Sequence, residues 1–150
     1  MTGTTHLAFV GLGVMGGPMT GHLARSGHRV TAYNRSPERA TKWRAAWAEE
    51  GLAVAFAGTP AEAAHGADVV FTCVGNDDDL AAVALGEDGV LASLGEGALL
   101  VDHTTTSAAM ARRLGEACAA RGTGFIDAPV SGGQAGADNG ALAVMCGGSD

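Results

Sequence analysis

Three glycines near the N-terminus, Gly11, Gly13 and Gly16, follow the apolar run HLAFV at 6–10 and open a helical pattern. At a strand-to-helix turn, this G-x-G-x-x-G spacing allows a tight turn, a close approach of the backbone to a ligand and close packing of the helix. Free N–H groups and the positive end of the helix dipole then stabilise bound phosphates. The spacing predicts a dinucleotide-binding loop, and a glycine turn without a ligand is the alternative.

The residues after the next apolar run indicate which dinucleotide binds. Asn34 lies 18 residues after Gly16, where NAD sites usually carry Asp or Glu for the ribose 2′-hydroxyl. Here Asn34, Arg35 and Ser36 offer an amide, a planar guanidinium and a hydroxyl, which suit a 2′-phosphate. The sequence therefore predicts a preference for NADP(H), with NAD(H) as the second choice. A solvated surface role for Arg35 is the competing interpretation.

A second chemical motif lies in the stretch FIDAPVSGGQAGADNG. An apolar run ends at Asp127, Pro129 stiffens its exit, and Ser131, Gly132 and Gly133 expose a hydroxyl and consecutive backbone N–H groups. A concave set of N–H groups of this kind binds a carboxylate. The alternative is a glycine-rich connection between two strands that binds nothing.

Strand-like and helix-like patterns alternate around these motifs. We expect strands at 6–10, 29–33, 52–56, 68–74, 98–103 and 124–128, helices that begin near Val14, Pro37, Ala61, Asp78 and Ser107, and a final apolar run at 142–146. This alternation predicts an α/β fold, a Rossmann-type doubly wound and mainly parallel sheet with right-handed crossovers.

The last expected helix, at 107–121, shows how the helices lie on the sheet. Met110, Leu114 and Cys118 recur at a spacing of four residues and therefore share one face, whereas Arg112 and Arg113 point elsewhere. This amphipathic pattern is typical of a helix that covers a sheet.

Composition limits the classes of partner. The chain has 150 residues, of which 47% are hydrophobic and 17% charged, which fits one domain with its own core. A net charge of −7 leaves no basic surface for nucleic acid. No apolar run reaches membrane-spanning length and no signal segment is visible, so we expect a cytoplasmic protein with a small-molecule partner and no membrane contact.

The cysteines and histidines do not form a metal-binding pattern. Cys73, Cys118 and Cys146 are far apart in the sequence and lie outside any C-x-x-C motif, and the five histidines show no H-x-x-x-H spacing. We therefore predict no metal site and no disulfide framework, and we expect the three cysteines to be small core residues.

Five motifs together carry a family resemblance. GLGVMGGPM (11–19), NRS (34–36), VDHTTTS (101–107), DAPVSGG (127–133) and GALAVMCGG (140–148) occur in this order across nearly the whole chain. In this respect the chain resembles the N-terminal domain of the β-hydroxyacid dehydrogenase family, which includes 3-hydroxyisobutyrate dehydrogenase, tartronate semialdehyde reductase and the 6-phosphogluconate dehydrogenases. Imine reductases share the glycine loop and NR but usually not Ser-Gly-Gly, and they stay as an alternative.

The resemblance implies roles for individual residues. It places the cofactor on Gly11, Leu12, Gly13, Val14, Met15, Gly16, Asn34, Arg35, Ser36, Val74, Asn76 and Thr105, with Thr105 at the nicotinamide half, and the substrate carboxylate on Ser131, Gly132 and Gly133. The sequence NDDD at 76–79 departs from the Leu-Pro type that many relatives carry there.

The resemblance also implies an activity and a missing part. The family's members are oxidoreductases that transfer a hydride between a nicotinamide and a small β-hydroxy acid or semialdehyde. Their proton-transferring lysine lies in a second, all-helical domain, which we expect beyond Asp150, with the whole protein a homo-oligomer. The chain's one lysine, Lys42, is expected on the surface. Residues 1–150 are then the cofactor-binding half, without a catalytic residue of their own and inactive alone; a freestanding NADP(H)-binding or sensor module is the alternative.

Overall fold

Strands and helices alternate along residues 5–149, the part of the chain that the computed structural model describes. The elements are β1 (His6–Val10), α1 (Gly16–Arg25), β2 (Arg29–Tyr33), α2 (Pro37–Glu49), β3 (Val54–Phe56), α3 (Pro60–Ala64), β4 (Val69–Thr72), α4 (Asp77–Leu85), the 3₁₀ turn η1 (Val90–Ala92), β5 (Leu99–Asp102), α5 (Ala108–Ala120), β6 (Gly124–Asp127), β7 (Val130–Ser131), α6 (Gly133–Asp138), β8 (Ala143–Val144) and β9 (Gly147–Gly148). Asp150, the residue after which the resemblance places the catalytic lysine, lies outside the described residues, so the position of that lysine stays a prediction.

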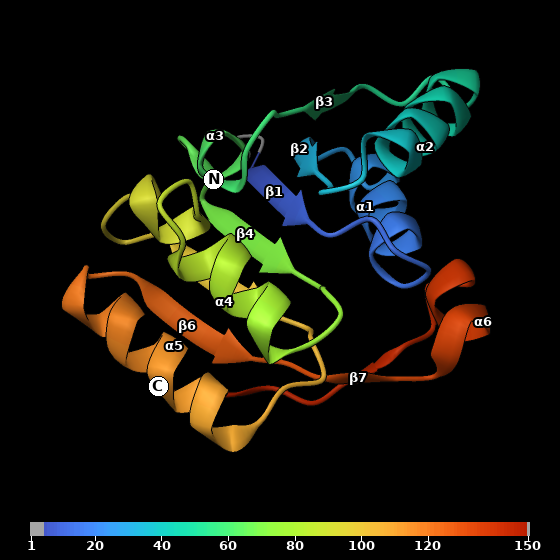
Figure 1. Ribbon diagram of the computed structural model, residues 1–150. Helices are drawn as coiled ribbons and strands as arrows, with labels where there is room; N and C mark the ends of the chain where they lie inside the picture. The colour runs from blue at the N-terminus through green and yellow to red at the C-terminus, as the bar shows by residue number, and fades with distance from the viewer. Residues whose placement is uncertain (1–4, 150) are drawn as a thin grey trace.

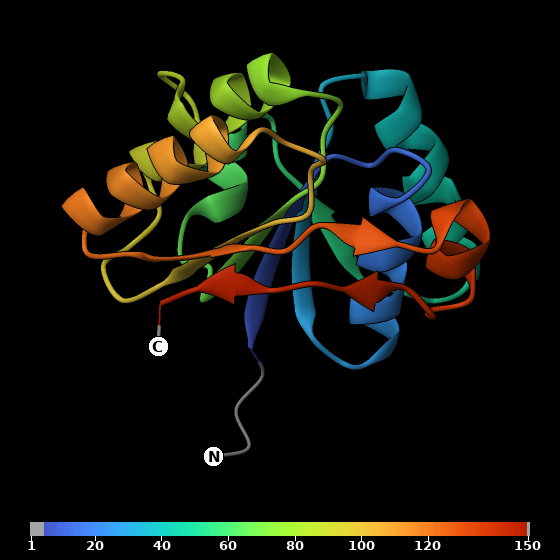
Figure 2. The same cartoon turned by 90° about the horizontal axis from the view of Figure 1, so that it is seen from below.

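One sheet with the strand order β3-β2-β1-β4-β5-β6-β9 organises these elements. Strands β1 to β6 are parallel, and β9 pairs with β6 in the antiparallel direction. The chain winds outward from β1 to β3 on one side and from β4 to β6 on the other, so helices cover both faces (Figures 1 and 2). This arrangement confirms the predicted doubly wound fold, whose ligand crevice lies between the carboxyl ends of β1 and β4.

Two apolar layers hold the sheet between its helices. Ala8, Val10, Val70 and Leu100 are buried in one cluster under α3 and α5. On the opposite face Leu12, Ala32 and Trp47 form a second cluster with α2. Because neighbouring residues of a strand point to opposite faces, continuous apolar strands such as LAFV serve both layers at once.

Helix α5 has the face that its sequence predicts. Met110, Leu114 and Cys118 are buried, and Arg112 and Arg113 are exposed. Ser107 begins the helix by accepting a hydrogen bond from the N–H of Met110, at 3.0 Å. The predicted amphipathic helix is therefore confirmed, with its cap.

The last quarter of the chain is more divided than the sequence indicates. The expected run at 142–146 contains only β8, which pairs with β7 in a separate two-stranded sheet, and α6 and β9 were not expected at all. Val144 and Met145 are consequently about half exposed, at 46% and 54%. Cys146 is also exposed and Cys73 only partly buried, so the expectation of three core cysteines is wrong for Cys146 and holds fully for Cys118.

None of the helices described between residues 5 and 149 combines the length and apolar character needed to span a bilayer. Nor does this part of the chain bring three or more His, Cys, Asp or Glu side chains together in a way that could hold a metal ion.

Candidate dinucleotide site

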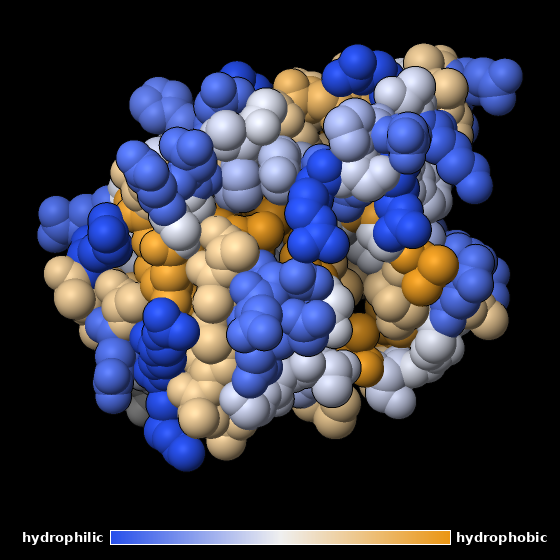
Figure 3. Space-filling view, in the orientation of Figure 1, coloured by the Kyte–Doolittle hydropathy of each residue, from blue (hydrophilic) through white to orange (hydrophobic). Residues whose placement is uncertain are grey.

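A cleft of about 810 Å³ opens at the carboxyl ends of β1, β2 and β4. Its size lies in the range of about 300–1,000 Å³ that is usual for small-molecule sites. Nine of the residues predicted to bind a cofactor line it: Gly11, Gly13, Val14, Met15, Gly16, Asn34, Arg35, Ser36 and Val74. Figure 3 shows strongly hydrophobic side chains in the hollows of this face of the molecule, with hydrophilic and moderately hydrophobic residues over its projecting parts.

Each glycine of the loop has a different physical role. Gly11 has a φ of 107°, and a Cβ there would lie 2.1 Å from the carbonyl oxygen of Cys73. A Cβ on Gly16 would lie 1.9 Å from the carbonyl oxygen of Gly11, so α1 can approach β1 only without a side chain. At Gly13, by contrast, the nearest atom is 3.7 Å away, on Arg39, which leaves open space on the ligand side. This cradle fits a pyrophosphate.

The start of α1 is also open to an anion. Helices α2 to α5 are all capped by a side chain, from Ser36, Thr59, Asn76 and Ser107 respectively. Met15 at the start of α1 makes no such bond, and the first turn of α1 has no acidic residue. The N–H of Gly17 donates to the carbonyl of Gly13 at 2.9 Å, and Pro18 has no N–H. The N–H groups of the loop before Gly17 and the helix dipole are therefore what this end of α1 offers to phosphate.

Asn34 ties the β2–α2 loop to the glycine loop. Its Oδ1 accepts a hydrogen bond from the N–H of Leu12 at 2.9 Å, and its Nδ2 donates to the carbonyl of Ser36 at 3.1 Å. The side chain of Leu12 is buried in the apolar layer, and its carbonyl accepts a bond from Trp43 Nε1. Leu12 therefore positions the loop from below, and Asn34 sets the distance between the two cofactor-facing segments.

Two guanidinium groups line the same end of the cleft. Arg35 is 80% exposed and forms an ion pair with Asp79, 3.1 Å away. Arg39 lines the cleft as well, one turn after Ser36 on α2, and its N–H donates to the Ser36 hydroxyl at 3.4 Å. Sequence reasoning missed Arg39, although its spacing of three from Ser36 places both on one side of the helix start.

Two other predicted cofactor residues lie differently. Asn76 caps α4, where its Oδ1 accepts from the N–H of Asp79 at 2.9 Å. Thr105 is exposed just beyond β5. Neither is among the residues that line the cleft in the described part of the chain. Val74 does line it, held by a bond from its N–H to Thr104 Oγ1 at 3.1 Å.

Two carboxyl groups lie at the ends of neighbouring strands, and sequence reasoning missed them as a pair. Asp102 and Asp127 are in register on β5 and β6. Asp102 Oδ1 accepts from Thr72 and from the N–H of Thr104, at 2.8 and 3.0 Å. Asp102 Oδ2 and Asp127 Oδ1 are buried without a hydrogen-bond partner among residues 5–149. Burial raises the pKa of Asp102, and the charge of Asp127 adds to this.

The thiol that lines the cleft is not activated. Burial raises the pKa of Cys73 to about 11, and the neighbouring Asp102 carboxyl acts in the same direction. Since the thiolate is the nucleophile, Cys73 stays protonated and unreactive near pH 7.

The predicted carboxylate clamp lies outside the cleft. Ser131 belongs to β7, Gly132 precedes α6 and Gly133 is its first residue; all three are exposed. Gly132 has a φ of 132° and Gly133 a φ of 61°, conformations that favour glycine, and a Cβ on Gly132 would press on Leu142 at 3.2 Å. The sequence of this turn is therefore explained by its backbone, whether or not it binds a ligand.

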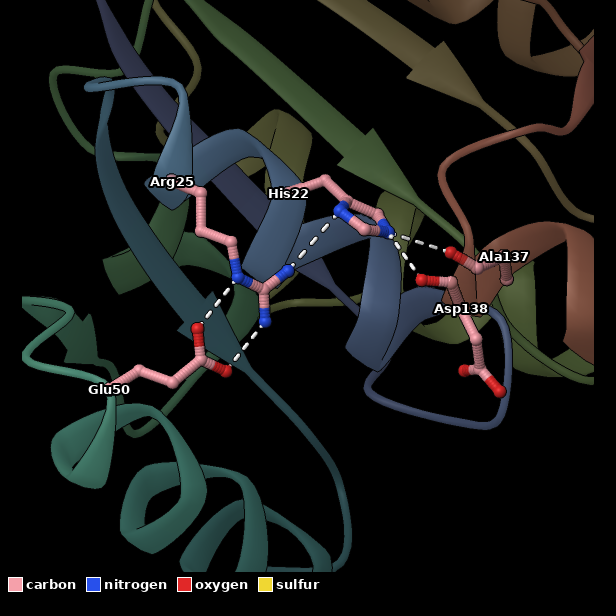
Figure 4. Close-up of polar contacts among 5 residues, drawn as sticks. All are labelled: His22, Arg25, Glu50, Ala137 and Asp138. Atoms are coloured by element: carbon pink, nitrogen blue, oxygen red, sulfur yellow. Dashed lines mark hydrogen bonds and ion pairs between the residues drawn. The ribbon is translucent and has the colours of Figure 1, made fainter.

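Helix α6 is held against α1 by a polar network that Figure 4 shows. Nε2 of His22 donates to the carbonyls of Ala137 and Asp138, at 2.8 and 3.1 Å, which leaves Nδ1 to accept from Arg25 at 3.2 Å. Arg25 in turn forks onto both carboxylate oxygens of Glu50 at 2.7 Å, and this bond lowers the pKa of Glu50. The network links α2, α1 and the end of α6.

Comparison with known proteins places the fold and the cleft in a family. The family model described as the NAD binding domain of 6-phosphogluconate dehydrogenase matches residues 6–150, and the chain belongs to this family. The fold, the nucleotide-binding class and the oxidoreductase family that the sequence predicted are thus confirmed.

Individual relatives agree with this assignment. The chain is 56% identical over 142 residues to an oxidoreductase of Shewanella frigidimarina, covering 95% of the chain and 47% of that protein. It is 38% identical over 144 residues to the 3-hydroxyisobutyrate dehydrogenase of Pseudomonas aeruginosa, covering 96% of the chain and 46% of that protein. The chain therefore spans about half the length of the curated relatives it matches.

Solved structures show the same likeness. The 3-hydroxyisobutyrate dehydrogenase of Mycobacterium tuberculosis, described with L-serine, superposes with a TM-score of 0.86 at 34% identity, over 99% of this chain and 48% of that one. The protein Psf3, described in complex with NADP⁺ and 2-OPP, has a TM-score of 0.84 at 31% identity, and the match covers 95% of this chain and 49% of Psf3. An imine reductase from a Pseudomonas species, at 24% identity and a TM-score of 0.72, shares the fold.

Proposed function

We propose that this chain is the NADP(H)-binding part of an oxidoreductase that transfers a hydride between the nicotinamide and a small β-hydroxy acid or the matching semialdehyde. One observation carries the cofactor choice. The end of β2 brings Arg35, Ser36 and Arg39 to the cleft, and the residue directly after Tyr33 is Asn34 rather than the acid that a ribose 2′-hydroxyl usually needs there. The description of Psf3 with NADP⁺ supports this choice.

Different residues of the cleft bind different groups of the cofactor. N–H groups of the glycine loop and the dipole of α1 hold the pyrophosphate, and the guanidinium groups of Arg35 and Arg39 bind the 2′-phosphate with the hydroxyl of Ser36. Val74 offers an apolar contact, and Asn76 supports that contact as the cap of α4. When bound, the nicotinamide donates or accepts the hydride.

The substrate class comes from the resemblance and the relatives. Ser131, Gly132 and Gly133 are proposed to hold the substrate carboxylate, and Thr105 to lie at the nicotinamide half. Relatives are described as 3-hydroxyisobutyrate dehydrogenases, and the mycobacterial one is described with L-serine, itself a small β-hydroxy acid.

Proton transfer is proposed to lie outside these residues. Lys42 is exposed on α2, the helix that connects β2 to the edge strand β3, and so it is remote from any hydride path. We propose that a helical domain beyond Asp150 supplies the lysine and that the whole protein is a homo-oligomer. The 150-residue chain is then expected to bind NADP(H) without turning over a hydroxy acid, as a freestanding binding module also would.

The test of the cofactor choice is a titration with NADPH and with NADH, followed by nicotinamide fluorescence, on the wild-type chain and on Arg35→Ala. A charge-assisted bond to phosphate contributes about 1.5–3 kcal/mol, so NADPH should bind roughly ten- to a hundred-fold more tightly than NADH. The substitution should remove most of this preference. Equal binding of both nucleotides to the wild type, unchanged in Arg35→Ala, would contradict the proposal.

Substrate turnover is tested on the full-length gene product. Mixtures of NADP⁺ with 3-hydroxyisobutyrate, L-serine or a cyclic amine are followed by the absorbance of NADPH. Reduction with a hydroxy acid supports the proposed substrate class. If NADP⁺ is reduced only with the cyclic amine, the imine reductase alternative is favoured. If NADP⁺ is reduced with none of these compounds, the binding module is favoured.

A further inference from the structure

An ion pair joins the two sides of the cleft. Arg35 comes from the loop after β2 and Asp79 from the first turn of α4, 44 residues later, and Nη1 of Arg35 lies 3.1 Å from Oδ1 of Asp79. Both side chains line the cleft. Arg35, the group proposed to bind the 2′-phosphate, therefore has an anionic partner within the chain itself.

The carboxylate is the less exposed member of this pair. The N–H of Asp79 donates to Asn76 Oδ1 at 2.9 Å, which ties Asp79 to the capped first turn of α4. The Asp79 side chain is 29% exposed, whereas that of Arg35 is 80% exposed. A bound phosphate can thus take the exposed guanidinium, while the Asp79 carboxylate stays beside it.

The other two aspartates of this turn have different surroundings. Asp77 accepts hydrogen bonds from the hydroxyls of Thr106 and Ser107, both at 2.6 Å, and so connects α4 to the start of α5. Asp78 is exposed and is not among the cleft residues in the described part of the chain. Asp79 is the aspartate of this turn that faces the nucleotide cleft.

We propose that Asp79 is a specificity-determining residue that competes with the 2′-phosphate for Arg35. It thereby weakens the binding of NADP(H) and reduces the preference for NADP(H) over NAD(H). This inference rests on the proposed function. An exposed pair is weak, so it does not prevent NADP(H) from binding. A carboxylate next to a phosphate nevertheless repels it. NAD(H) has no 2′-phosphate, so neither this competition nor this repulsion acts on it.

The test compares Asp79→Asn with Asp78→Asn, each titrated with NADPH and NADH at low ionic strength. The two variants lose the same charge from the same helical turn, so the comparison cancels the effect on the helix dipole and on net charge. We expect Asp79→Asn to lower the Kd of NADPH roughly five- to ten-fold and to change the Kd of NADH less than two-fold. Asp78→Asn should change neither Kd by more than two-fold.

Three results would overturn the inference. One is weaker binding of NADPH by Asp79→Asn, because Asp79 would then position Arg35 for the phosphate. The second is a gain in affinity by Asp79→Asn that is equal for NADPH and NADH. The third is a gain in NADPH affinity by Asp78→Asn that equals the gain by Asp79→Asn. Asp79→Ala serves as a second neutral variant, and unfolding midpoints of all variants show that each is folded.

A double variant separates this inference from the proposed function. In Arg35→Ala there is no guanidinium for the phosphate and Asp79 to compete for. Adding Asp79→Asn to this variant should therefore increase the affinity for NADPH less than adding it to the wild type. If Arg35→Ala leaves the ratio of the two Kd values unchanged, the proposed 2′-phosphate site fails. If Arg35→Ala removes the preference but Asp79→Asn does not increase it, only the role of Asp79 fails.

Discussion

At the scale of single residues, the buried carboxyl of Asp102 predicts a pH dependence of stability. Burial raises its pKa, so the folded chain holds the proton to higher pH than the unfolded chain. Its contribution to stability is thus fully present below the unfolded pKa and is lost as the pH rises through the folded pKa. In Asp102→Asn, Oδ1 can still accept from Thr72 and Thr104, and the new N–H lies next to Asp127.

We expect Asp102→Asn to be more stable than the wild type by about 1 kcal/mol at pH 8 and to lose this advantage near pH 4. Urea unfolding of both proteins across this range measures the difference. Asp138→Asn, which removes an exposed carboxyl on α6, should show no such trend. If the free energies of unfolding of Asp102→Asn and the wild type differ by the same amount at all pH values, ionisation of Asp102 is not the cause of the difference.

Local chemistry made part of the site predictable from the sequence. The spacing of Gly11, Gly13 and Gly16 and the residue types after Tyr33 indicate a phosphate-binding loop by themselves, and the cleft contains them. The pairing of Arg35 with Asp79 depends instead on the strand order β2-β1-β4, which brings the loop after β2 close to the first turn of α4. The partners of Asp102 depend in the same way on strand register. Neither leaves a pattern in the sequence.

At the scale of elements, the contact between α1 and α6 positions the predicted carboxylate clamp. His22 satisfies two carbonyls at the end of α6, a helix of six residues that is too short to be stable by its own bonds. His22→Ala should therefore increase hydrogen exchange roughly ten-fold at the amides of residues 133–140 and destabilise the chain by about 1 kcal/mol. Its effect on the Kd of NADPH should stay below two-fold, since His22 does not line the cleft in the described part of the chain.

His65→Ala is the matched control, because His65 is exposed at the end of α3. Exchange that rises throughout the sheet in His22→Ala would argue against a local role for the network.

The contrast between long and short elements also explains which of them the sequence predicts. Strands such as β1, β4 and β5 are nearly continuous apolar runs, and α5 repeats buried residues every four positions. Strands β7, β8 and β9 have two residues each and α6 has six, so these elements depend on their neighbours.

At the scale of the whole molecule, the apolar surface of the chain predicts self-association. A groove of about 210 Å³ between α1, the sheet and β8 is lined by apolar side chains that include Met19, Leu23, Phe71 and Val144. Met145, next to it in the sequence, is 54% exposed. Apolar surface of this kind, left uncovered, promotes association. We expect the weight-average sedimentation coefficient of the 150-residue chain to rise with concentration.

The double substitution Val144→Thr/Met145→Gln tests whether this surface is the cause. Both side chains lie at β8, outside the apolar layers that hold the sheet, so the fold should persist while the association weakens several-fold. Substitution of Val14, which is 60% exposed at the start of α1, removes apolar surface at the dinucleotide cleft and serves as the control. If the wild-type chain sediments as a monomer at high concentration, its apolar groove is too small to drive association, and the oligomer proposed for the whole protein must be built from other surfaces.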